Sequence, residues 1–189
     1  ELMKRADIFP AGHCDDIGIG KPLICGREYV FECQEFTRHG SQGMIVPIHV
    51  GIIVGGGENA RILVIPTASL LNETGPMYKE LFEDMGSNAM CVPVEKREDC
   101  FNEETLRILE NATGVFITGG NQLRLSTILG GTPVARRIRS MNAAGVHVGG
   151  TSAGAAIVSE HMIAGGKEGS TPSPDMVNMA PGLGLTNAF

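Results

Sequence analysis

Short apolar segments alternate with segments of helical periodicity along the chain after residue 43. The apolar segments predict buried strands, because they are short and bounded by glycine, proline or polar residues. They cover residues 45–54, 61–66, 89–94, 114–118 and 145–149. Apolar residues at helical spacing predict helices over residues 75–85, 102–111 and 133–144. Strands that alternate with helices in this way predict an α/β fold, in which a parallel sheet is flanked by helices on both faces.

Residues that commonly begin helices support two of these assignments. Thr74 is expected to cap the first helix, with Pro76 just inside it. Asn102 is expected to cap the second helix, ahead of an acidic first turn at Glu103 and Glu104 that suits the helix dipole.

Ligands of open parallel sheets bind at the carboxyl ends of the strands. The loops that follow Pro66, Thr118 and Gly150 are therefore the expected ligand-binding loops, and all three have polar or glycine-rich sequence. Residues 1–43 show no periodicity of either kind. We expect an N-terminal segment of unknown role at residues 1–43 and an α/β domain at residues 44–189.

Composition narrows the range of partners. The 189 residues are 42% hydrophobic and 19% charged, which is typical of a folded globular unit. A net charge of -6 disfavours binding to nucleic acid. No apolar run reaches the roughly 20 residues that a membrane span needs, and the first residues do not resemble a secretion signal. We expect a cytoplasmic protein that binds neither nucleic acid nor membrane.

The cysteines do not indicate a disulfide framework, since five of them occur without a C-x-x-C pair. A zinc site of His13, Cys14, Cys25 and Cys33 is an alternative that the spacing disfavours. The glycine run at residues 55–57 lacks the spaced third glycine of a dinucleotide-binding motif. We therefore expect neither a metal nor an organic cofactor.

The strongest chemical signal lies at residues 146–157, where an apolar strand passes through small residues into an expected helix. The pattern Gly150-x-Ser152-x-Gly154 matches the nucleophile elbow of hydrolases. Such a turn presents the serine hydroxyl to a carbonyl substrate, and the backbone N–H of Ala153 would help to stabilise the oxyanion. Taken alone, the pattern leaves an alternative open, because serine between glycines is more often a turn residue or a helix cap.

Further motifs follow one another in order along the chain. They are IPTAS at residues 65–69, TGGNQLRL at 118–125, GGT at 130–132, GGTSAGA at 149–155 and MAPGLGL at 179–185. Together they resemble the motifs of the cyanophycinases, serine peptidases related to the aspartyl dipeptidases. The resemblance extends from about residue 51 to residue 189.

The resemblance implies a class I glutamine-amidotransferase-like, or flavodoxin-like, fold. It also implies a peptide or polymer substrate: cyanophycinases cut cyanophycin, an arginine-bearing polyaspartate, into β-aspartyl-arginine dipeptides. Ser152 matches the family nucleophile, and Gly119, Gly120, Asn121 and Gln122 match the loop that contributes to the oxyanion hole and to substrate contacts. A plain loop in which Asn121 caps a helix is the alternative for that turn. The family's habit further suggests a homodimer.

A serine nucleophile needs a neighbouring base, usually histidine. In the family, this histidine lies in an Asp-Gln-His-Phe stretch shortly after the PGLGL motif, whereas this sequence stops at Phe189. We expect His147 to lie in the core and His161, on the helix after Ser152, to lie far from the hydroxyl. No position is predicted for His13, His39 and His49. The simplest explanation is a fragment of a longer protein, and we expect the 189-residue chain alone to have little peptidase activity.

Three charged residues lie in or beside the expected substrate loops: Glu73, Arg124 and Asp175. They could contact the arginines and carboxylates of the polymer, or be solvated surface residues. Residues 170–174 could form a loop that folds over a substrate. Two other functions remain open, an aspartyl dipeptidase and a non-catalytic fragment that binds a partner.

Overall fold

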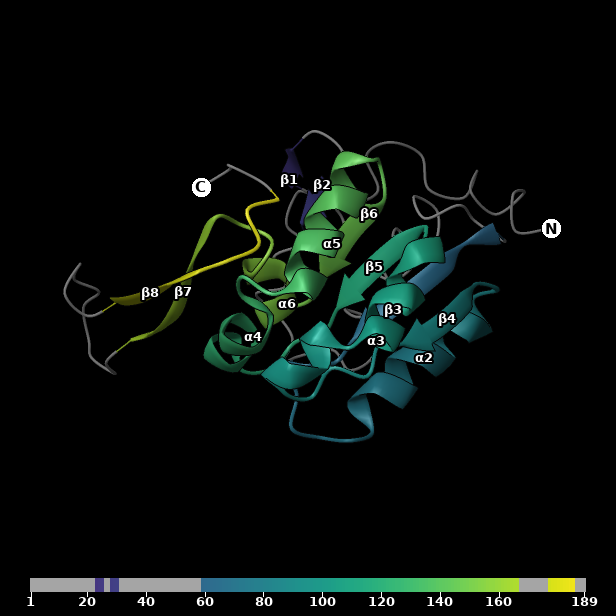
Figure 1. The fold of residues 1–189 in the computed structure, drawn as a ribbon, viewed down its shortest axis with the longest axis horizontal. Coiled ribbons are helices and arrows are strands. Elements are labelled where there is room, and N and C mark those ends of the chain that lie inside the picture. Colours follow the sequence, from purple (N-terminus) through teal and green to yellow (C-terminus); the bar gives the residue numbers. More distant parts are fainter. Residues whose placement is uncertain (1–22, 26–27, 31–58, 167–176, 186–189) are drawn as a thin grey trace, which may run out of the picture.

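The structure is a computed structural model that describes residues 23–25, 28–30, 59–166 and 177–185. Its central sheet has four parallel strands in the order β4-β3-β5-β6 (Figure 1). Their bounds are Arg61–Ile65 for β3, Asn88–Cys91 for β4, Gly114–Ile117 for β5 and His147–Gly150 for β6. The parallel sheet confirms the prediction from the alternating pattern, while the strand predicted at residues 45–54 lies outside the described residues.

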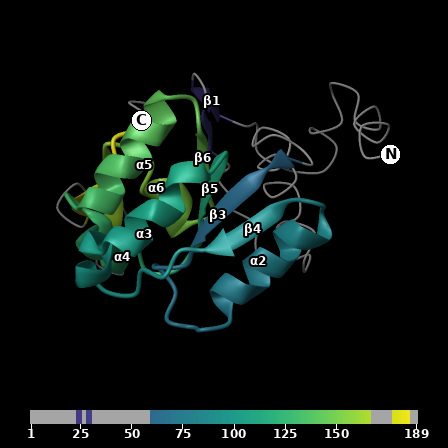
Figure 2. The same cartoon turned by 45° about the vertical axis from the view of Figure 1, so that its right-hand side comes forward.

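Helices cover both faces of this sheet (Figure 2). One face carries α2 (Thr74–Asp84). The other carries α3 (Glu103–Ile108), α4 (Gln122–Leu129), α5 (Pro133–Ala143) and α6 (Ala153–Ala156). Two 3-10 turns, η4 (Arg97–Phe101) and η5 (Leu109–Asn111), flank α3. The predicted two-faced arrangement is confirmed.

Two short antiparallel pairs complete the described structure. One pairs β1 (Leu23–Cys25) with β2 (Glu28–Val30), and the other pairs β7 (His161–Gly166) with β8 (Val177–Pro181). Within the described ranges, no helix is both long and apolar enough to cross a bilayer.

Strand β3 supplies side chains to two separate cores. Ile62 and Val64 belong to the cluster on the α2 face, while Leu63 and Ile65 belong to the cluster on the opposite face. This division follows from strand geometry, since successive side chains point to opposite faces of a sheet. The continuous apolar sequence of β3 is therefore that of a strand buried on both sides.

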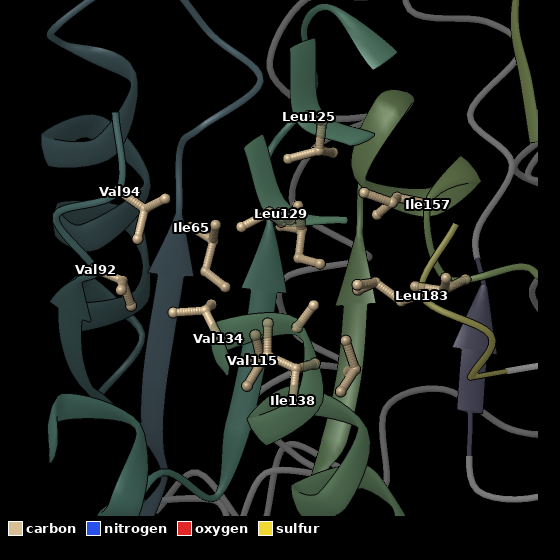
Figure 3. Close-up of a cluster of buried hydrophobic side chains, with 14 of the residues drawn as sticks. Ile65, Val92, Val94, Val115, Leu125, Leu129, Val134, Ile138, Ile157 and Leu183 are labelled. Carbon is tan, nitrogen blue, oxygen red and sulfur yellow. The ribbon is translucent and has the colours of Figure 1, made fainter. Parts of the chain in front are cut away.

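The larger core lies between the sheet and helices α4 and α5 (Figure 3). Ile65 from β3, Leu125 and Leu129 from α4 and Ile138 from α5 are all fully buried there. Ile157, just after α6, packs into the same cluster. The short segment that follows the expected elbow is thus anchored in the main core.

Helix ends agree with the sequence in one case and differ in another. Asn102 caps α3 as predicted, because its side chain accepts a hydrogen bond from the amide of Glu104 at 2.8 Å. The predicted cap at Thr74 is wrong, since α2 begins at Thr74 and Glu73 holds the capping position. The Thr74 hydroxyl instead lies 2.8 Å from the hydroxyl of Ser69, in the loop after β3.

Three elements are shorter than their sequence patterns predict. Helix α3 ends at Ile108 rather than at residue 111, and the 3-10 turn η5 follows it. Strand β4 ends at Cys91 rather than at residue 94, because Pro93 has no N–H with which to extend the ladder. Helix α6 has only four residues, so His161 begins strand β7 and does not lie on the helix. The chain turns out of α6 where the Ser159 hydroxyl donates to the carbonyl of Ala156 at 2.7 Å.

We expect Ile138→Ala to lower the free energy of unfolding by about 2–5 kcal/mol, because it leaves a cavity in the larger core. Urea unfolding measures this loss. The matched control is Arg137→Ala on the same helix, which removes an exposed ion pair to Glu110 at 3.7 Å and should cost at most about 1 kcal/mol. Equal losses in the two variants would contradict the position of the core.

Candidate active site

Three loops meet at the carboxyl ends of β3, β5 and β6. The amide of Asn121, after β5, donates to the carbonyl of Ala68, after β3, at 2.9 Å. The amide of Thr151, after β6, donates to the carbonyl of Ile117 at the end of β5, at 3.1 Å. The loops after Pro66, Thr118 and Gly150 therefore lie together, and their binding of a ligand stays a prediction.

Ser152 stands on a strained turn between β6 and α6. Its φ of 52° and ψ of -114° make it the only described non-glycine residue with positive φ. The residue is exposed, and its side chain makes no capping hydrogen bond to α6. A strained strand-to-helix turn of this kind is typical of a nucleophile elbow. Ser152 occupies the N-cap position of α6, but its side chain does not cap the helix.

Backbone hydrogen bonds hold this turn in its strained state. The carbonyl of Thr151 accepts from the amide of Gly154 at 2.9 Å. The carbonyl of Ser152 accepts from the amides of Ala155 and Ala156 at 3.0 and 2.9 Å. A conformation of this kind costs roughly 1–3 kcal/mol and persists only where its surroundings over-determine it.

A close approach to β5 explains the glycine after the serine. A Cβ atom added to Gly154 would lie 2.0 Å from the carbonyl oxygen of Ile117. Only a residue without a side chain allows α6 to begin this close to the strand. Ala153, which directly follows Ser152, is fully buried.

The Gly119-Gly120-Asn121-Gln122 turn lies beside the elbow. A Cβ atom on Gly119 would lie 3.3 Å from the Cβ of Ser152. Gly120 has a φ of 143°, and a Cβ there would lie 2.2 Å from the carbonyl oxygen of Ala68. The structure therefore brings the first part of the predicted site together with the predicted nucleophile.

Asn121 and Gln122 have structural contacts in this turn. The side chain of Asn121 caps α4 by accepting from the amide of Arg124 at 2.8 Å, as the alternative for this loop anticipated. The Nε2 of Gln122 donates to the carbonyl of Ile163 on β7 at 2.9 Å. Contact between Gln122 and a substrate stays a prediction.

Arg124 joins three segments around the turn. Its Nε donates to the carbonyl of Thr67 at 2.9 Å, and one terminal nitrogen donates to the carbonyl of Glu95 at 2.8 Å. These contacts tie α4 to the segments that follow β3 and β4. Glu73 is exposed at the start of α2, whereas Asp175 and residues 170–174 lie outside the described residues.

The described histidines occupy two strands. His147 is partly buried at the start of β6, and His161 is exposed at the start of β7. The remaining histidines, His13, His39 and His49, lie outside the described residues. The base therefore stays a prediction from the family resemblance.

Cys91 and Cys100 are free thiols. Burial raises the pKa of both Cys91 and Cys100, which disfavours the reactive thiolate at neutral pH. Within the part of the chain that the structure describes, no three His, Cys, Asp or Glu side chains gather in a metal-binding arrangement. The side chains considered for zinc at residues 13, 14, 25 and 33 are not described.

The sequence model of peptidase family S51 matches residues 49–188, which include the central sheet, the elbow and the glycine turn. The chain belongs to this family. The cyanophycinase of Trichormus variabilis is 44% identical over 133 residues, covering 69% of this chain and 45% of that protein. The cyanophycinase of Geminocystis herdmanii is 42% identical over the same length, covering 69% of this chain and 49% of that protein. The resemblance to cyanophycinases is confirmed, and the chain spans about half the length of these relatives.

Solved structures of peptidases have the same fold. A crystal structure of a peptidase from an acI-B1 Actinobacterium aligns with a TM-score of 0.59 at 24% identity, covering 84% of this chain and 64% of that one. The predicted class I glutamine-amidotransferase-like architecture is confirmed. At this level of identity the likeness concerns the fold alone.

We expect Gly154→Ala to lower the free energy of unfolding by about 3 kcal/mol or more, because the new methyl group would meet backbone atoms that cannot yield. The control is Gly86→Ala, where φ is 85° but nothing lies within 4 Å of the added Cβ. That variant should cost about 1–2 kcal/mol, from the backbone conformation alone. Urea unfolding compares the two, and an equal or smaller loss for Gly154→Ala would contradict the close approach.

Proposed function

We propose that this chain carries the nucleophile of a serine peptidase that hydrolyses cyanophycin to β-aspartyl-arginine dipeptides, with Ser152 forming the acyl-enzyme. The observation that carries the proposal is the exposed position of Ser152 on a turn with a φ of 52°, beside Gly119. Backbone strain of this kind concentrates at functional sites. Cyanophycinases at 42–44% identity support the choice of substrate.

The reaction is an acyl transfer in two halves. The Oγ of Ser152 attacks the scissile carbonyl carbon while a base removes the hydroxyl proton. The tetrahedral intermediate then breaks its C–N bond, and the amine leaves with a proton from the protonated base. Water, deprotonated by the same base, attacks the ester and restores the serine hydroxyl.

Backbone amides around Ser152 are suited to the developing oxyanion. Ala153 directly follows the nucleophile, and its amide has the role that the residue after the serine takes in other elbows. Gly119 lies beside Ser152, and neither Gly119 nor Gly120 has a side chain that would keep a substrate oxygen from their main-chain N–H groups. Donors of this kind typically contribute about 3–4 kcal/mol to lowering the barrier.

The base is expected from the segment after the PGLGL motif, as the family resemblance implies. The motif packs directly on the residues that follow α6, since the amide of Leu183 donates to the carbonyl of Ile157 at 2.6 Å. The amide of Leu185 likewise donates to the carbonyl of Val158 at 2.8 Å. A segment that continues from Leu185 therefore starts close to the nucleophile helix, which supports delivery of a histidine from that side.

Charge also favours this substrate. The chain has 21 acidic residues against 15 lysines and arginines, so its field attracts a polymer that displays guanidinium groups. Glu73 is exposed in the loop between β3 and α2, near the carboxyl end of the sheet. Arg124 is engaged with two carbonyls, and we expect it to support the loops rather than to bind a substrate carboxylate.

Replacement of the nucleophile tests the proposal in the complete protein. We expect Ser152→Ala to lower kcat for release of β-aspartyl-arginine from cyanophycin at least about a thousandfold, because no acyl-enzyme can form. The matched control is Ser159→Ala, which removes a nearby hydroxyl that donates to the carbonyls of Ala156 and His161. That variant should keep most of the activity.

Two outcomes would overturn the proposal. Undiminished turnover by the Ser152→Ala protein would remove the nucleophile. Both substrates should be assayed in parallel. Cleavage of aspartyl dipeptides without cleavage of cyanophycin would indicate an aspartyl dipeptidase instead.

We expect the side chain of Gln122 both to stabilise the fold, through its bond to Ile163, and to contact the substrate. Gln122→Ala should lower the free energy of unfolding by about 1 kcal/mol, through loss of the bond to Ile163, and raise the KM for cyanophycin. Ser126→Ala is the control, since Ser126 also joins α4 to the β7–β8 pair, through a 2.7 Å bond to the carbonyl of Pro181. It should lose similar stability without a change in KM. Equal KM values in the two variants would leave Gln122 with a structural role only.

A further inference from the structure

The hydroxyl of Tyr78 lies 3.2 Å from the hydroxyl of Thr151, the residue directly before Ser152. We infer that Tyr78 and Thr151 form a positioning pair that holds the nucleophile turn in its reactive conformation. The inference rests on the proposed function, because it assigns a role in the reaction of Ser152. Tyr78 lies outside the sequence motifs, and Thr151, although part of the GGTSAGA motif, was given no role there.

Tyr78 is a rigid support for this contact. It lies on α2 with 6% of its surface exposed, and its ring centroid is 5.2 Å from that of Phe116 on β5. The ring of Phe116 in turn meets Phe82 edge-on, also at 5.2 Å. A tyrosine packed in an aromatic cluster has few accessible rotamers, so its hydroxyl stays at one position next to Thr151.

Thr151 links the fixed Tyr78 hydroxyl to Ser152, because it directly precedes Ser152 in the chain. Its amide is fixed to the carbonyl of Ile117, and its hydroxyl is fixed to Tyr78, so both its backbone and its side chain are held. The same hydroxyl would lie 3.7 Å from a Cβ on Gly119. Thr151 therefore stands between the α2 core and the glycine turn, and any rotation of it would move Ser152 relative to that turn.

Because the backbone of Ser152 is strained, loss of the hydrogen bond between Tyr78 and Thr151 is expected to lower kcat. A residue at a φ of 52° relaxes when its neighbours permit, and relaxation would turn the hydroxyl away from the attack position. Misplacement of this kind lowers the rate of chemistry more than the binding of substrate. Tyr78 and Thr151 are thus positioning residues whose loss should reduce kcat and leave KM nearly unchanged.

The experiment is a double-mutant cycle in the complete protein. Tyr78→Phe and Thr151→Val each remove one hydroxyl and should lower kcat for cyanophycin by about three- to tenfold, the range that follows from one hydrogen bond. The double variant should be no slower than the slower single variant, because the pair acts as a unit. Thr151→Ser keeps the hydroxyl, so its kcat should lie within about twofold of the wild-type value.

Hydrogen exchange gives a readout that does not depend on activity. Removal of either hydroxyl should speed amide exchange in the peptide that covers residues 148–156, because the elbow is less constrained. The control is Thr113→Val, which removes a hydroxyl that accepts from the amide of Arg61 at 2.8 Å, at the opposite end of the sheet. This variant should change neither kcat nor exchange at the elbow.

The outcomes separate this inference from the proposed function. If Ser152→Ala keeps full activity, the proposed function fails, and the exchange data alone decide whether the pair holds the turn. Unchanged kcat and unchanged exchange in both single variants would overturn the inference. Additive losses in the double variant, or a rise in KM without a fall in kcat, would also overturn it.

Discussion

The turn at Ser152 depends on its contacts with the carbonyl oxygen of Ile117 at the end of β5. This oxygen accepts a hydrogen bond from the amide of Thr151, and it lies so close to Gly154 that a Cβ there would be only 2.0 Å away. This contact brings the start of α6 onto the end of β5. Ser152 lies between Thr151 and Gly154, has a φ of 52° and is exposed.

Each face of the sheet supports this turn in its own way. On one face, the aromatic cluster of Tyr78, Phe82 and Phe116 reaches the elbow through the hydroxyl of Thr151. On the other, Ile157 anchors the segment after α6 in the larger core. Ser152, the proposed nucleophile, thus lies where two separately packed cores meet the carboxyl edge of one sheet. A site held by rigid elements on both sides keeps the precise geometry that acyl transfer needs.

Much of this arrangement could be predicted from local sequence. The apolar runs of β3 and β5, the cap at Asn102 and the spacing of small residues around Ser152 each reflect interactions between near neighbours in the chain. The errors occurred where distant segments decide the outcome. Helix α6 was expected to continue to His161, but it ends after four residues, because the Leu183 segment pairs with the carbonyl of Ile157. The β7–β8 pair was not predicted either, because it joins two segments that are separated in the sequence.

The sequence by itself determined the α/β class, the family and the serine at the elbow, because hydrophobic periodicity and short glycine motifs are properties of consecutive residues. Only the tertiary structure decided which groups surround that serine. The proximity of Gly119, the contact of Gln122 with Ile163 and the support of Thr151 by Tyr78 join residues 33 to 73 positions apart. Such contacts form when strands and helices pack, and their geometry depends on the packing rather than on any local pattern.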